Sequence, residues 1–161
     1  MGIEELERIK KFFKQLGIEP VYMEHEPVVT SEDAAKTRGF ELKQGIKAIV
    51  LTNGKNEWLI VNVPADKKIN IKTVAQQKGW SRGKIRMATP EEVLEKTGSE
   101  IGAVPPFGHK EEIPLFVDRG IFENKECAFN IGLRTHSVKI KTEAMKKIFH
   151  QLKATEGFFT S

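Results

Sequence analysis

The chain has 161 residues, 39% of them apolar and 30% charged, which is typical of one soluble globular domain covering residues 1–161. Its apolar runs are far shorter than the roughly 18 residues of a transmembrane helix, and its charged first residues differ from a secretory signal, so we expect a cytoplasmic protein with no membrane partner. The net charge of +4 permits an anionic partner without requiring one, and the single cysteine, Cys127, excludes an intramolecular disulfide and a zinc finger.

The first half of the chain alternates between helical and strand-like patterns. Apolar residues at helical spacing predict the first helix, an N-cap at Thr30 or Ser31 with Gly39 beyond the end predicts a second, and β-branched apolar runs predict extended segments. Asn53-Gly54 lies between two such runs and predicts an antiparallel hairpin. In chain order the predicted elements are a helix at 3–16, an extended segment at 21–25, a helix at 30–36, and strands at 46–52 and 57–63.

The second half contains the clearest helix start. Thr89 precedes Pro90, and Glu92 follows three residues after Thr89, which is the pattern of a capping box. Gly98 then ends the helix. The predicted elements are a helix from about 70 to 79, a strand at 84–88, a helix at 90–97, strands at 115–118, 126–130 and 136–141, and a helix around 145–152.

The fold class predicted from these elements is α+β. Short strands outnumber helices and at least one connection is a hairpin, so we expect a mixed, largely antiparallel central sheet, partly barrel-like, with flanking helices. The sequence contains no glycine-rich dinucleotide or phosphate-loop motif, and its four histidines lack the spacing of metal ligands. We therefore expect neither a cofactor nor a metal.

Lys47 is an unusual residue in its strand. It interrupts a run that is apolar on both alternating faces, residues 46–51. Two interpretations are open. Its ammonium can reach solvent from the end of the strand, as long side chains often do, or its charge can meet an anionic substrate inside a cleft.

Residues 98–108 form a loop with three glycines and two prolines directly after a helix. Pro105 and Pro106 stiffen the loop, while Gly102 and Gly108 allow its backbone to approach a ligand. Backbone amides of such a loop can form an oxyanion hole. A wide structural turn would have the same composition.

A third feature is the basic stretch between Asp66 and Arg86. It is a candidate phosphate-binding surface, although a solvated face would look the same. The RNA-contacting residues that we predict within it are Lys67, Lys68, Lys72 and Arg82.

Together these segments resemble the YbaK/ProX family of aminoacyl-tRNA editing domains. The resemblance covers about residues 20 to 141, and it depends on several weak motifs that occur in the same order. They are residues 25–35, Gly45-Ile46-Lys47, Val63-Pro64-Ala65-Asp66, the loop 98–108, Leu115-Phe116-Val117-Asp118 and Phe129-Asn130-Ile131-Gly132.

The resemblance implies hydrolysis of the ester that joins an amino acid to the terminal adenosine of tRNA. In this family Lys47 would hold the terminal ribose and phosphate region, and the backbone of Gly102–Pro106 would position the aminoacyl group. The implied catalytic set is Lys47, Gly102 and Pro106. The implied substrate-binding set is Ala103, Val104, Pro105, Phe107, Gly108, Asp118, Asn130 and Gly132.

The amino acid that is removed stays open at this point. Ala48 follows Lys47 where the alanine-specific branch resembles Lys-Asn, so cysteine, alanine, serine and threonine all remain candidates, on tRNA-Pro or a related tRNA. An aminoacyl-tRNA synthetase is a further candidate partner. The alternative from another class is a non-catalytic module that binds RNA or docks on a synthetase; no DNA partner is expected.

Overall fold

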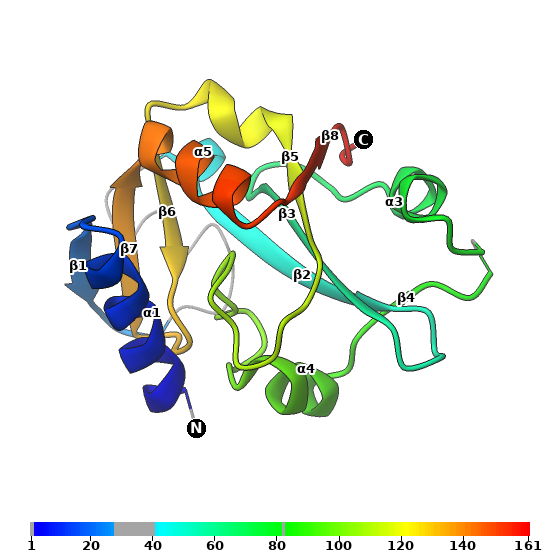
Figure 1. The fold of residues 1–161 in the computed structure, drawn as a ribbon, viewed down its shortest axis with the longest axis horizontal. Helices are drawn as coiled ribbons and strands as arrows, with labels where there is room; N and C mark the ends of the chain where they lie inside the picture. Colours follow the sequence, from blue (N-terminus) through cyan, green and yellow to red (C-terminus); the bar gives the residue numbers. More distant parts are fainter. Residues whose placement is uncertain (1, 28–40, 82) are drawn as a thin grey trace.

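The computed structural model describes residues 2–27, 41–81 and 83–161 (Figure 1). The helix predicted at 30–36 lies outside these residues. The helical elements are α1 (Ile3–Gln15), η1 (Leu42–Gln44), α3 (Ile71–Lys78), α4 (Pro90–Thr97), η2 (Arg119–Glu123) and α5 (Thr142–Gln151). The strands are β1 (Val21–Glu24), β2 (Ile46–Thr52), β3 (Trp58–Pro64), β4 (Arg86–Met87), β5 (Leu115–Asp118), β6 (Glu126–Asn130), β7 (His136–Lys141) and β8 (Thr155–Gly157).

Local signals account for most of these boundaries. The capping box at α4 is formed as predicted: the Glu92 N–H donates to Thr89 Oγ1 over 3.2 Å, and the Thr89 N–H donates to Glu92 Oε1 over 2.9 Å. Gly98 ends α4 in the left-handed region, at φ 78°. The β2–β3 hairpin is also formed, with Lys47 opposite Val63 and Ala48 opposite Asn62.

The strands form two sheets, and this corrects the prediction of one central sheet. One sheet has the order β1-β7-β6 and the other β4-β2-β3-β5-β8. Among the described residues both sheets are open, so the barrel-like closure that we predicted is not observed. β5 pairs parallel with both β3 and β8, and the remaining pairs are antiparallel, so the α+β class with a mixed, largely antiparallel pairing is confirmed.

The largest core cluster joins α1 and α5 to the three-stranded sheet (Figure 1). Its centre is Phe107, whose ring lies 5.5–5.9 Å from the rings of Phe12, Phe13, Phe129 and Phe149. Because Phe107 belongs to the loop after α4, this loop is anchored in the main core. Within the described residues, no helix is long and apolar enough to cross a membrane.

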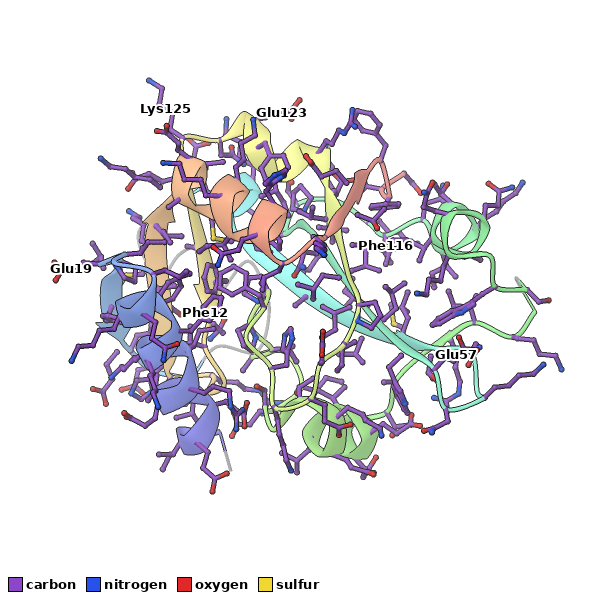
Figure 2. The ribbon with its side chains drawn as sticks, viewed as in Figure 1. Phe12, Glu19, Glu57, Phe116, Glu123 and Lys125 are labelled. Carbon is purple, nitrogen blue, oxygen red and sulfur yellow. The ribbon has the colours of Figure 1, made fainter. Side chains whose placement is uncertain are left out.

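The β2–β3 hairpin is covered on both faces. Leu51, Leu59 and Val61 pack with Val74 of α3 on one face. Val50 and Ile60 pack with Val93 of α4 and with Val104 on the other. Figure 2 shows Glu57 at the far end of this hairpin, on the opposite side of the molecule from Phe12 of α1.

Candidate active site

Lys47 lies at the second residue of β2, near the end of the hairpin where the chain enters the sheet. Its side chain is half-buried, and Nζ donates a hydrogen bond to the carbonyl of Lys67 over 2.8 Å. Burial lowers the pKa of Lys47 from its ordinary value, while the nearby Asp66 carboxylate acts in the opposite direction. The ammonium therefore has a main-chain partner that an anionic or hydroxyl group of a ligand could replace.

The structure places Lys47 and the glycine-proline loop on opposite faces of the β2–β3 hairpin. Residues next to each other in a strand point to opposite faces. Ile49 packs on the face covered by α3, and Ala48 packs on the face covered by α4. Asn62, which pairs with Ala48, reaches the loop carbonyl of Pro106. Lys47 thus shares the α3 face, and a ligand that meets both Lys47 and the loop must pass around the start of β2.

The loop itself is mostly buried, with one exposed corner. Gly102 is exposed and adopts φ +84°, a conformation that side chains rarely take. The next five residues, 103–107, are buried. Gly108 also has a positive φ, and a Cβ there would lie 2.8 Å from Ile9 Cδ1 of α1. Only the backbone around Gly102 is thus presented at the surface.

Asp118 and Asn130, which also belong to the predicted substrate-binding set, make structural contacts. Asp118 accepts hydrogen bonds from the N–H groups of Gly120 and Phe159, and so holds the C-terminal segment on the sheet. Asn130 Nδ2 donates to the carbonyls of Leu133 and His136, and so closes the β6–β7 turn.

Close packing accounts for the presence of a glycine at position 132, another residue of this set. Gly132 has φ +104°, and a Cβ there would lie 2.9 Å from both the Cβ of Glu5 and the carbonyl oxygen of Gly2. Its N–H donates to the Ala103 carbonyl over 2.8 Å, so Gly132 joins the β6–β7 turn to the loop.

The predicted RNA-binding residues lie on the Lys47 side of the hairpin. Lys67 and Lys68 follow β3, Lys72 lies in the first turn of α3, and all three side chains are exposed. Arg82 lies outside the described residues. Because the Lys67 carbonyl is the partner of Lys47, the basic stretch begins directly beside Lys47.

Two residues that the sequence analysis missed contact the loop. His109 Nε2 donates to the Pro105 carbonyl over 2.6 Å, and Asn62 Nδ2 donates to the Pro106 carbonyl over 3.1 Å. The pKa of His109 is lowered to about 4, chiefly by burial, with the hydrogen bond to Pro105 acting in the opposite direction and the Arg8 charge adding a smaller lowering, so the imidazole is neutral at pH 7. Asn62 had a signal in the sequence, because it is a polar residue inside an apolar strand, as Lys47 is.

The model for the family described as "Aminoacyl-tRNA editing domain" matches residues 25–148. The chain belongs to this family. The resemblance found in the sequence is thereby confirmed, and with it the class of activity, an editing hydrolase that acts on aminoacyl-tRNA.

Known proteins resemble this editing domain over much of its length. The Escherichia coli (strain K12) multifunctional Ser/Thr-tRNA deacylase ProXp-y is 34% identical over 140 residues, which cover 84% of this chain and 83% of that protein. The proline–tRNA ligase of Trichlorobacter lovleyi is 28% identical over 121 residues, 74% of this chain but only 21% of the ligase. The fold matches the crystal structure of a protein proposed to be a trans-editing enzyme for prolyl tRNA synthetase, with a TM-score of 0.84, 23% identity, and coverage of 98% of this chain and 97% of that one.

The described residues of this editing domain offer neither a metal site nor a reactive cysteine. Among residues 2–27, 41–81 and 83–161, no group of three or more His, Cys, Asp or Glu side chains could hold a metal ion. Cys127 is buried beside Thr142, and burial raises the pKa of its thiol to about 11, which disfavours the thiolate that a nucleophile needs.

A cavity of about 350 Å³ lies at the far end of the hairpin, beside Trp58 and Trp80. Its charged lining is mixed: Lys78 and Lys96 face Glu57, Glu111 and Glu112. Since Trp58 is five residues along β3 from Val63, the partner of Lys47, roughly 17 Å of strand separates this cavity from Lys47. It is therefore separate from the Lys47 region.

Proposed function

We propose that this editing domain is a trans-editing deacylase that hydrolyses the ester of tRNA carrying serine or threonine. The observation that carries the proposal is the 34% identity with the E. coli Ser/Thr-tRNA deacylase over 84% of one chain and 83% of the other. This match covers most of both sequences. The ligase match, by contrast, covers about a fifth of a much larger protein.

In the proposed reaction, water attacks the carbonyl carbon of the ester. The bond between that carbon and the ribose oxygen breaks, the ribose oxygen takes up the proton that the water loses and becomes a hydroxyl, and the free amino acid leaves. Lys47 binds the terminal ribose and phosphate region in exchange for the Lys67 carbonyl, and the backbone of Gly102–Pro106 positions the aminoacyl group. Such positioning, together with donors aimed at the developing negative charge, can supply much of the rate enhancement.

The remaining parts of the proposal concern the whole protein. One editing domain spans residues 1–161, and it acts in the cytoplasm, where aminoacyl-tRNA is used. Lys67, Lys68, Lys72 and Arg82 contact phosphates of the acceptor stem, while Asp118, Asn130 and Gly132 support the substrate pocket through the contacts described above.

The test is deacylation of a panel of mischarged tRNAs carrying serine, threonine, alanine or cysteine. We expect the wild-type protein to release serine and threonine fastest. Lys47→Ala should lower kcat/KM roughly 100-fold, because a charge-assisted contact to the substrate is lost. The matched control is Lys55→Ala, an exposed lysine at the far end of the hairpin, which should leave the rate unchanged.

Urea unfolding of each variant separates loss of a site charge from loss of the fold. A wild-type protein that binds the charged tRNAs but releases no amino acid would replace this proposal with the non-catalytic binding module. An active Lys47→Ala protein would remove Lys47 from the site.

A further inference from the structure

Side chains from separate parts of the chain hold the carbonyl groups of the glycine-proline loop. Arg134 Nε and Nη2, from the β6–β7 turn, donate to the Ile101 carbonyl over 3.2 and 2.9 Å. Asn62 Nδ2, from β3, donates to the Pro106 carbonyl, and His109 donates to the Pro105 carbonyl. The loop is therefore held from both sides of its exposed corner at Gly102.

Asn62 is fully buried, and its orientation is determined by its contacts. Nδ2 donates to the carbonyls of Pro106 and Phe116, so Oδ1 must point elsewhere. That oxygen has no hydrogen-bond partner among the described residues. A buried acceptor without a partner destabilises a protein by about 1–3 kcal/mol. Stability alone therefore does not explain an asparagine at this position, whereas its bond to the loop does.

Fixing a carbonyl also fixes the amide that follows it. In a trans peptide the C=O and the next N–H point in opposite directions, and no cis peptide bond occurs in the described residues. Arg134 thus directs the Gly102 N–H away from itself, and Asn62 does the same to the Phe107 N–H. Within the described residues the Gly102 N–H donates to no acceptor and Gly102 is exposed, so this amide is available to a ligand, whereas Phe107 is fully buried and its N–H is not. Pro106 has no N–H, and the bond from His109 therefore only stiffens the loop.

We propose that Arg134 and Asn62 are positioning residues: Arg134 orients the exposed Gly102 N–H toward the carbonyl oxygen of the aminoacyl ester, and Asn62 fixes the far end of the same loop at Pro106. This inference rests on the proposed deacylase function and adds two residues to it. Both act through the backbone, so their loss lowers turnover more than substrate binding. An Arg134 that instead contacted a tRNA phosphate would affect binding and its salt dependence.

The experiment compares Arg134→Gln with Arg134→Met, since glutamine keeps an N–H donor without the charge and methionine keeps neither. With seryl-tRNA we expect Arg134→Met to lower kcat about 10-fold with KM within twofold of wild type. Arg134→Gln should recover kcat to within about threefold of wild type. Equal losses in both variants, or a raised KM with a flatter salt dependence, would assign the charge to RNA binding and overturn the proposal.

A second variant, Asn62→Leu, tests the hydrogen bond from Asn62 to the loop, because leucine has a similar volume and no donor. It should lower kcat about 10-fold while the urea midpoint shows that the protein is folded. The amide NMR signals of residues 101–104, 107 and 108 are recorded in every variant, since Pro105 and Pro106 have no N–H. If the wild-type protein deacylates nothing, the proposed function fails, and the NMR signals still report on the loop: shifts in Arg134→Met but not in Arg134→Gln show that a donor at position 134 holds it. Unchanged signals in all three variants would overturn the positioning role.

Discussion

His109 links the loop to an acid-dependent loss of stability. Its pKa is lowered to about 4 from the ordinary value of 6.5, chiefly because burial disfavours the charged imidazole. The unfolded chain therefore binds a proton below about pH 6.5, and the folded protein does so only below about pH 4. The contribution of neutral His109 to the free energy of unfolding is therefore complete above about pH 6.5, and it is lost as the pH falls from about 6.5 to about 4.

The size of this effect follows from the two pKa values. A shift of one pKa unit corresponds to 1.36 kcal/mol, so the full loss is about 3 kcal/mol, and about 2 kcal/mol of it is reached at pH 5. His109→Gln removes the titration but keeps an N–H donor for the Pro105 carbonyl. The difference in unfolding free energy between wild type and His109→Gln should therefore change by about 2 kcal/mol from pH 8 to pH 5.

Urea unfolding at a series of pH values measures this difference, and contributions from the other titrating groups cancel between the two proteins. His150→Gln is the control, because His150 is exposed on α5. Its unfolding free energy should follow the wild-type pH dependence. The reasoning would be refuted if wild type and His109→Gln lost stability in parallel between pH 8 and pH 5.

Two further predictions test the RNA surface and the core. Replacing Lys67, Lys68 and Lys72 together with alanine should raise KM and flatten its salt dependence by roughly one unit per lost contact, with kcat little changed; an unaltered salt slope would place the tRNA on another face, with Arg134, Lys139 and Lys141 as the next candidates. Phe107→Ala should lower the unfolding free energy by about 3–5 kcal/mol, because it leaves a cavity among four aromatic rings. Urea unfolding measures this loss, and a cost below about 1 kcal/mol would contradict the packing described here.

Features that depend on neighbouring residues could be predicted from the sequence. The capping box at Thr89, the turn at Asn53-Gly54 and the glycine that ends α4 act within a few residues, so their chemistry is present in the sequence itself. The family resemblance also came from the sequence, because it depends on the order of short motifs. Lys47 and the loop were identified as candidates in the same way, from residue types that are unusual in their surroundings.

Features that depend on long-range pairing could not be predicted. The separation into two sheets, the parallel partners of β5 and the short strand β8 are set by which surfaces meet in the folded chain. The same applies to the donors that hold the loop. Asn62 and Arg134 lie 44 and 33 residues from the carbonyls they bind, so no local pattern shows what they contact, although Asn62 stands out as a polar residue in an apolar strand. Local chemistry therefore determined the elements and the family, and only tertiary packing decided which side chains orient the loop backbone and which face of the hairpin Lys47 occupies.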